Sequence, residues 1–130
     1  MKLSHLLSAI GAPCPQDVGI TSLACVSREV TPGALFVALE GATVDGRAYI
    51  PEALTRGTAA IVYANSPSAG SLPDGVPAII IDDPRAALAA LAAEFYGHPA
   101  RELTLIAVTG TKGKTTTTFM LRDILTAAGH

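Results

Sequence analysis

The sequence predicts an α/β fold, because apolar runs of strand length alternate with helix-forming segments along the chain. The run "AIIID" at residues 78–82 is short and rich in isoleucine, as in a buried strand, and an alanine- and leucine-rich helical segment follows it. Near residue 110 a glycine-rich loop separates another apolar run from a second helix-forming segment. This repeated order favours α/β over an all-β fold.

Composition fits a small globular protein with a real core. Of the 130 residues 49% are hydrophobic, and the net charge is −2. The positive charges are dispersed and only Lys112 and Lys114 cluster, so we expect no nucleic-acid partner. Cys14 and Cys25 form no metal-type or redox-type pair, which predicts free thiols in a reducing cytoplasm.

The N-terminal segment predicts a short amphipathic helix rather than a signal peptide. Leu3, Leu6, Leu7 and Ile10 follow the i, i+3, i+4, i+7 spacing of one helix face. Polar residues interrupt the apolar stretch, and no segment approaches the roughly 20 apolar residues that span a membrane. We therefore expect no membrane contact. The protein is also expected to be cytoplasmic, in line with its free thiols, and monomeric.

Five apolar runs predict strands, and punctuation by proline and glycine separates them. The runs are residues 19–27, 35–39, 59–64, 78–82 and 103–109. Pro32 and Gly33 supply a turn between the first two, and residues 65–77 form a long loop.

Two helices are predicted between these runs. Residues 45–57 are expected to form a loop and a short helix, with Pro51 in the first turn and Gly57 as the stop. A clearer helix begins with Asp83 as N-cap and Pro84 as its first residue.

The second of these helices is expected to pack on the sheet and to end a domain. Its apolar stripe consists of Leu88, Leu91, Ala92 and Phe95. Gly97 and Pro99 stop it within a polar break. We therefore predict a complete domain at residues 1–99 and the first strand, loop and helix of a second domain at residues 100–130.

The segment "VTGTKGKTTTT" at residues 108–118 has the features of a phosphate-binding loop. Gly110 and Gly113 allow the backbone N–H groups to approach phosphate, and the following helix directs its N-terminal dipole at the anion. Lys114 supplies positive charge for the β- and γ-phosphates, and the Thr115 hydroxyl is suited to Mg²⁺.

The loop departs from the general pattern G-x-x-x-x-G-K-[ST]. Val108 stands where the first glycine is expected, so the loop has the shorter form G-x-x-G-K-T. A glycine turn that only joins a strand to a helix is the alternative, but strand, loop and a helix from about residue 114 to 128 together favour a phosphate site. Lys112 either contacts phosphate or points at solvent, and both possibilities stay open.

The loop, as T-G-T-x-G-K-T-T, resembles the ATP loop of the Mur ligase family, cytoplasmic enzymes that build the peptide stem of bacterial peptidoglycan. Upstream, "SREVTPGALFVALEGATVDGRAYIPEALTRGTAAIVYA" is similar to the UDP-binding domain of members that add the third residue (MurE type) or the terminal dipeptide (MurF type). The segment "FYGHPARELTLIAVTGTKGKTTTT" is similar to the MurE type in particular. The resemblance covers nearly all of the chain.

The resemblance implies two sets of binding residues. Those for the UDP-sugar are Cys25, Ser27, Ala42, Thr43 and Val44. Those for ATP are Gly110, Thr111, Lys112, Gly113, Lys114, Thr115 and Thr116, with Lys114 also catalytic and Thr115 a magnesium ligand. Val26 replaces the family's aspartate, and Lys112 replaces its usual asparagine.

Each implied contact in the first domain has a structural alternative. Ser27 alone reads as turn chemistry, Arg28 as half of a surface ion pair, and Asp45–Gly46 as a simple turn.

The resemblance also implies a reaction. The γ-phosphoryl group of ATP, with Mg²⁺, activates the carboxylate of UDP-N-acetylmuramoyl-L-alanyl-D-glutamate as an acyl phosphate, which the amine of meso-diaminopimelate or L-lysine attacks. The remaining ATPase and amino-acid domains are expected beyond His130, so we predict that this chain alone has no ligase activity and that its last strand packs poorly. Alternatives are a MurF-type ligase, a cyanophycin- or folylpolyglutamate-type synthetase, or a non-catalytic UDP-sugar-binding module.

Overall fold

The chain divides into two compact units, Met1–His98 and Pro99–His130. A computed structural model describes residues 1–41, 45–65 and 75–129.

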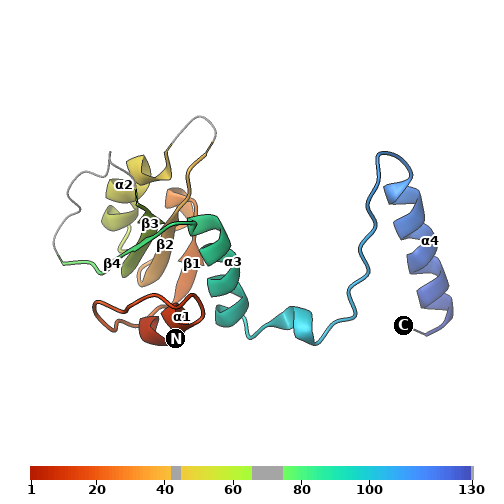
Figure 1. Ribbon diagram of the computed structural model, residues 1–130, viewed down its shortest axis with the longest axis horizontal. Coiled ribbons are helices and arrows are strands. Elements are labelled where there is room, and N and C mark those ends of the chain that lie inside the picture. The colour runs from red at the N-terminus through yellow and green to blue at the C-terminus, as the bar shows by residue number, and fades with distance from the viewer. Residues whose placement is uncertain (42–44, 66–74, 130) are drawn as a thin grey trace. The chain divides into compact units, whose positions relative to one another are not determined.

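Within these residues the first unit is built on a four-stranded parallel sheet, in the order β1-β2-β3-β4 (Figure 1). The strands are β1 (Ser22–Ala24), β2 (Ala34–Ala38), β3 (Ala60–Ala64) and β4 (Ala78–Ile81). Leu35 lies opposite Leu23 of β1 and Ala60 of β3, which fixes the register of the central pair. Because the strands are parallel, their carboxyl ends meet at one edge of the sheet, where open α/β sheets generally bind ligands.

Helices cover both faces of this sheet. They are α1 (Leu3–Ser8), α2 (Ile50–Thr55) and α3 (Pro84–Phe95). Alternate residues of β2 point to opposite faces, so Leu35 and Val37 pack with α1 and α3, whereas Ala34 and Phe36 pack with α2. The first unit is therefore a three-layer α/β/α arrangement.

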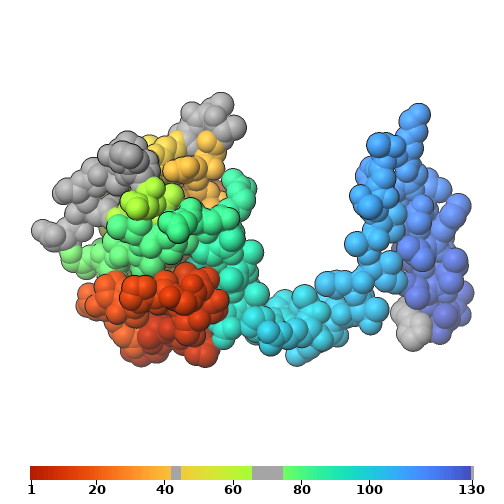
Figure 2. Space-filling view, viewed as in Figure 1, coloured from red at the N-terminus to blue at the C-terminus, as the bar shows by residue number. Residues whose placement is uncertain are grey.

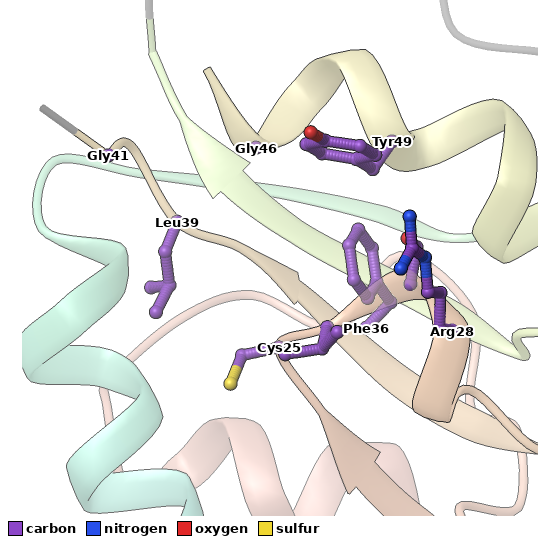
Figure 3. Close-up of a pocket in the computed structure, with 9 residues that line it drawn as sticks. Cys25, Arg28, Phe36, Leu39, Gly41, Gly46 and Tyr49 are labelled. Carbon is purple, nitrogen blue, oxygen red and sulfur yellow. The ribbon is translucent and has the colours of Figure 1, made fainter. Parts of the chain in front are cut away.

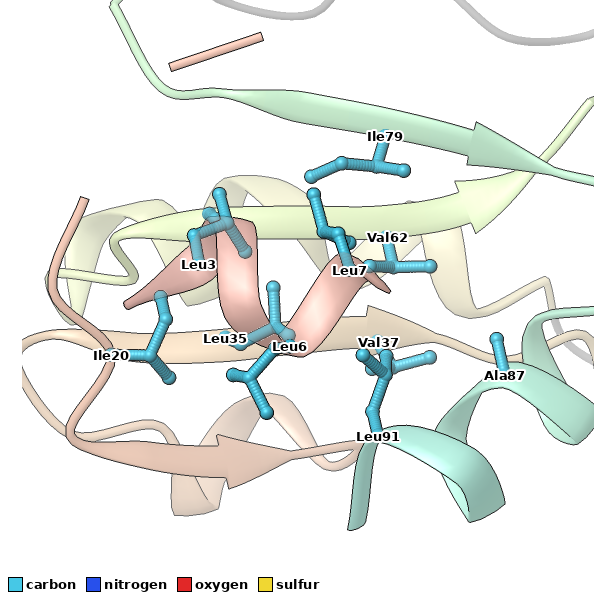
Figure 4. Close-up of a cluster of buried hydrophobic side chains, with 11 residues drawn as sticks. Leu3, Leu6, Leu7, Ile20, Leu35, Val37, Val62, Ile79, Ala87 and Leu91 are labelled. Carbon is cyan, nitrogen blue, oxygen red and sulfur yellow. The ribbon is translucent and has the colours of Figure 1, made fainter. Parts of the chain in front are cut away.

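The larger core lies between the sheet and the pair α1 and α3 (Figure 4). Its fully buried large side chains include Leu3, Leu6, Leu7, Ile20, Leu35, Val37, Val62 and Leu91. In the space-filling view the N-terminal residues of α1 (red) adjoin residues of α3 (green) on the surface of this unit (Figure 2). The burial of Leu3, Leu6 and Leu7 confirms the amphipathic N-terminal helix, but α1 ends at Ser8, so Ile10 packs on the core from the turn that follows.

Local signals in the sequence placed the helix ends and turns of the first unit well. The Asp83 side chain accepts hydrogen bonds from the N–H groups of Arg85 and Ala86, at 3.0 and 2.9 Å, and so caps α3 as predicted. The turn before β2 is closed by a 3.0 Å hydrogen bond between Ala34 N and Thr31 O. The first strand is shorter than the predicted 19–27 at both ends. It begins only at Ser22, and after Ala24 the chain bends and enters the 3₁₀ helix η1 (Ser27–Glu29).

The second unit contains a short 3₁₀ helix, η3 (Pro99–Arg101), and the helix α4 (Lys114–Ala127). The strand predicted at residues 103–109 is wrong for this structure, because residues 104–109 form no regular element. A strand needs a neighbour to pair its backbone N–H and C=O groups, and the described residues of this unit include no strand. Leu105 and Ile106 are accordingly 71% and 56% exposed.

The described residues contain neither a candidate membrane span nor a candidate metal cluster. None of their helices combines the length and apolar character that a membrane span requires. No group of three or more His, Cys, Asp or Glu side chains in the described ranges is placed to hold a metal ion.

Candidate nucleotide-binding sites

A cavity of about 320 Å³ opens at the carboxyl ends of β1 and β2. Its lining comes from the segment after β1, from β2 and the residues after it, and from the 3₁₀ helix η2 (Gly46–Tyr49). The lining residues are Cys25, Val26, Ser27, Arg28, Phe36, Leu39, Gly41, Gly46 and Tyr49. Figure 3 shows the labelled side chains arranged around this space.

The cavity combines apolar walls with a few polar groups. Phe36 is buried, whereas the Tyr49 residue is 44% exposed and offers an aromatic face. Arg28 is the one fully charged side chain among the described lining residues. An aromatic surface suits a base, and a guanidinium group suits a phosphate, so the chemistry of this cavity fits a nucleotide.

Ser27 is held between the cavity and α2. The residue is only 6% exposed, and its hydroxyl donates a 2.6 Å hydrogen bond to Oε2 of Glu52. This hydrogen bond, followed by the charges of Arg56 and Arg28, keeps the pKa of the Glu52 carboxyl below its usual value. Ser27 therefore has a fixed tertiary partner that turn chemistry alone does not provide.

Backbone contacts join the residues that follow β2 to the residues that begin η2. Gly46 N donates to Leu39 O at 3.0 Å, and Glu40 and Asp45 form an isolated antiparallel bridge. The guanidinium Nε of Arg47 donates to both oxygens of Asp45, at 3.0 and 2.8 Å. The hydrogen bonds from Arg47 lower the pKa of Asp45, and the backbone contacts connect the turn at Asp45–Gly46 to the residues after β2.

The structure brings part of the predicted UDP-sugar set together. Cys25 and Ser27 lie on the cavity, while Ala42, Thr43 and Val44 lie outside the described residues. Arg28, considered above as a surface ion-pair residue, also lines the cavity. The binding roles of these residues stay predictions.

Reasoning from the sequence missed two lining residues, Phe36 and Tyr49, and one residue, Glu52, that contacts the lining residue Ser27. Phe36 read only as part of a buried strand, and Tyr49 as part of a loop before a helix. Glu52 gave no signal, because its contact with Ser27 joins residues 25 apart in the chain. Only the pairing of η1 with α2 reveals it.

The predicted phosphate loop lies before α4. Gly113 has a left-handed φ of 78° and Gly110 has a φ of 144°. Residues with a side chain rarely adopt these backbone conformations. No side chain caps the start of the 14-residue helix, and the N–H groups of a first helical turn have no partner within the helix. The loop therefore presents backbone donors at the positive end of a helix dipole.

The side chains predicted to contact ATP are exposed on this loop. Lys114 is the first residue of α4, and its ammonium group donates to the carbonyl oxygen of Gly110 across the loop. Thr115 and Thr116 lie in the first helical turn. Thr111 and Lys112 lie in the bend between the two glycines. Lys112 is exposed, and its contact with phosphate, like the ATP and magnesium roles of the loop, stays a prediction.

Comparison with known sequences identifies relatives over the whole chain. A 50% identical protein is the UDP-N-acetylmuramyl-tripeptide synthetase of Roseiflexus sp. (strain RS-1), with 99% of this chain and 26% of that protein covered. A 42% identical protein is the UDP-N-acetylmuramoyl-L-alanyl-D-glutamate--2,6-diaminopimelate ligase of Chlorobaculum tepidum, with 98% of this chain and 26% of that protein covered. The chain thus spans about a quarter of the length of these curated relatives.

Solved structures share the fold. A MurF structure from Acinetobacter baumannii matches with a TM-score of 0.67 and 26% identity, over 95% of this chain and 27% of that one. MurF ligase from Thermotoga maritima in complex with ADP matches with a TM-score of 0.55 and 33% identity, over 74% of this chain and 21% of that one.

A family model places these similarities in one group. The model for the Mur ligase family, catalytic domain, matches residues 19–96, which include the sheet and the cavity at its edge. The match is more than half of the 130 residues. Together with the relatives of MurE type, which extend the similarity through the phosphate loop, it shows that the chain belongs to the Mur ligase family.

Proposed function

We propose that this chain is the N-terminal part of a cytoplasmic, ATP-dependent ligase that adds the third residue to UDP-N-acetylmuramoyl-L-alanyl-D-glutamate. The added residue is meso-diaminopimelate or L-lysine. The observation that carries the proposal is 42–50% identity to tripeptide-forming synthetases along the full chain, including both the cavity segment and the phosphate loop. In this proposal the protein contributes to peptidoglycan synthesis and hence to cell shape and division.

The first unit is proposed to hold the UDP end of the acceptor. Its cavity at the carboxyl edge of the sheet has the place expected for a nucleotide in an α/β fold. Tyr49 offers a surface for a base, Arg28 offers charge for phosphate, and Ser27 offers a polar contact. These features support binding through Cys25 and Ser27, and the proposed roles of Ala42, Thr43 and Val44 rest on the resemblance to the family.

The phosphate loop is proposed to hold ATP. Its positive-φ glycines and uncapped helix start fit a polyphosphate, and the exposed Thr115 hydroxyl fits the oxygen ligands that Mg²⁺ prefers. Bound Mg²⁺ would neutralise charge on the phosphates during transfer. We assign Lys114 to the transferred phosphoryl group, because its ammonium group already lies across the loop on the Gly110 carbonyl oxygen, and the loop N–H groups would orient the phosphates.

The reaction follows from the weakness of a carboxylate as an electrophile. Transfer of the γ-phosphoryl group to the acceptor carboxylate creates an acyl phosphate and releases ADP. The amine of the incoming amino acid then attacks the acyl carbon, an amide bond forms, and phosphate leaves. This chemistry depends on positioning and charge neutralisation. In the proposal, the two candidate nucleotide sites of this chain position the acceptor and ATP.

A MurF-type ligase is the second candidate. The observation that favours it is the similarity to MurF structures, at 26% and 33% identity. The higher identity to tripeptide synthetases, 50% and 42%, ranks the MurE-type function first.

The test is a ligation assay with the complete gene product, ATP, Mg²⁺, UDP-N-acetylmuramoyl-L-alanyl-D-glutamate and either amino acid. We expect UDP-linked tripeptide together with ADP and phosphate, and no product from the 130-residue chain alone. Absence of tripeptide combined with transfer of D-alanyl-D-alanine to a UDP-linked tripeptide would replace the proposal with the MurF-type function. Product formed by the 130-residue chain would contradict the proposal that the reaction needs residues outside this chain.

A further inference from the structure

Glu52 contacts the candidate UDP cavity only through another residue. It lies on α2 and is not among the lining residues, whereas its partner Ser27 is. The Ser27 hydroxyl donates to Glu52 Oε2 at 2.6 Å, and the Ser27 residue is buried to 6% exposure. The geometry gives Glu52 control over what the Ser27 hydroxyl can offer to a ligand.

The direction of this hydrogen bond follows from the charge of Glu52. The Ser27 hydrogen bond lowers the pKa of its carboxyl, with nearby Arg56 and Arg28 acting in the same direction. Arg56 Nε lies 3.5 Å from Glu52 Oε1 on the same helix. An ionised carboxylate has no hydrogen to donate, so Ser27 is the donor.

A serine hydroxyl carries one hydrogen and two lone pairs. With the hydrogen directed at Glu52, the lone pairs of Oγ are what remain for a further partner. A further contact at Oγ is therefore favourable only with a group that donates. A phosphate oxygen without a proton would place two acceptors against each other.

We propose that Glu52 is a positioning residue that makes Ser27 a hydrogen-bond acceptor toward the cavity, and that Ser27 thereby selects a donating group of the nucleoside. The donor is an N–H of the base or an O–H of the ribose. The inference rests on the proposed function, in which this cavity takes the UDP end of the acceptor.

The phosphates need a donor rather than an acceptor, and a different residue supplies it. Arg28 follows Ser27 directly and is the cation among the described lining residues. Its guanidinium group donates and cannot accept. The cavity thus separates a site that reads the nucleoside from a site that neutralises the diphosphate.

The test measures dissociation constants of the 130-residue chain by NMR titration with UDP and with analogues that each lack one donor. The analogues are N3-methyl-UDP, 2′-deoxy-UDP and 3′-deoxy-UDP. We expect one of them to bind about 3- to 10-fold more weakly than UDP, the range for one neutral hydrogen bond. Ser27→Ala should reduce that ratio toward one.

Two helix variants separate positioning from the general effect of losing charge. Glu52→Leu removes the acceptor, frees the Ser27 hydrogen, and should reduce the same ratio. Arg56→Gln removes the Arg56–Glu52 ion pair but keeps the Ser27 contact, so the ratio should stay at its wild-type value. A purely structural role for Glu52 would change affinity for all nucleotides equally and leave the ratio unchanged, which would overturn the proposal.

A comparison of UDP with UMP tests the phosphate assignment. We expect the loss of affinity on removing the β-phosphate to be equal in the wild-type chain and in Ser27→Ala. The opposite result is that UDP and UMP bind Ser27→Ala with equal affinity, while all three donor-deleted analogues bind the wild-type chain like UDP. Ser27 would then contact phosphate, and the inference would be wrong. If UDP and the UDP-linked acceptor fail to bind the wild-type chain, the proposed function of the cavity fails first, and this inference fails with it.

Discussion

At the scale of single residues, Gly46 lines the cavity at a position where the backbone leaves no room for a side chain. A Cβ placed there would lie 2.2 Å from the carbonyl oxygen of Leu39. That oxygen also accepts the 3.0 Å hydrogen bond from Gly46 N. Because the obstructing atom belongs to the backbone, it cannot move aside as a flexible side chain would. The requirement for glycine here is steric.

Gly46→Ala should therefore lower the free energy of unfolding by about 1–3 kcal/mol, as for other overpacked sites, and weaken UDP binding. Urea denaturation measures the first effect. Gly19→Ala is the matched control, because a Cβ at Gly19 meets nothing within 4 Å. Equal stability of Gly46→Ala and the wild-type chain would contradict the steric account.

Lys114 is the residue on which the ATP assignment depends most. Lys114→Ala in the complete gene product should weaken ATP binding roughly 10- to 100-fold, since hydrogen bonds to charged groups contribute about 1.5–3 kcal/mol. Arg122→Gln provides a control, because Arg122 is a cation on the same helix that pairs with Asp123. Unchanged ATP affinity and turnover in Lys114→Ala would remove this lysine from the site.

At the scale of elements, Glu94 joins the two helices on one face of the sheet. Its Oε1 lies 2.8 Å from Nε2 of His5 on α1, and its Oε2 lies 2.8 Å from Nε2 of His98 just after α3. The hydrogen bond with His98 is the main cause that lowers the pKa of Glu94, and His5 adds to it. The carboxylate thus favours the folded state when it is ionised.

This contact predicts a loss of stability in acid. Because the folded pKa of Glu94 lies below its unfolded value, near 4.5, the contribution is complete above that value and disappears as the pH falls through the folded pKa. In Glu94→Gln the free energy of unfolding should fall less steeply than in the wild-type chain as the pH is lowered below the unfolded pKa. Parallel slopes for Glu94→Gln and wild type would refute the linkage.

Elements with strong local signals could be predicted from the sequence. These signals depend only on neighbouring residues. They are the cap by Asp83, the run of helix formers after it, and the apolar runs at residues 35–39, 59–64 and 78–82. The pairing of strands and the contact between Ser27 and Glu52 depend on residues far apart in the chain, so no local pattern contains them. The strand expected at 103–109 has suitable residues but no pairing partner in the described part of its unit.

At the scale of the whole molecule, the two units differ in how much apolar surface they bury. The first unit has two hydrophobic clusters, one on each face of its sheet. The second exposes large apolar side chains: Leu103, Leu105, Ile106, Phe119, Met120 and Ile124 are 52–71% exposed. The chain spans about a quarter of its relatives' length, which agrees with the proposal that the ligase reaction needs more than these residues.

The central claim is that the cavity of the first unit holds the UDP end of the acceptor. Titration of the ¹⁵N-labelled 130-residue chain with UDP-N-acetylmuramoyl-L-alanyl-D-glutamate tests it most directly. We predict saturable shift changes in the amide signals of Cys25, Ser27 and Tyr49, and weaker binding in Ser27→Ala. Unchanged signals for these residues up to millimolar acceptor would contradict the claim.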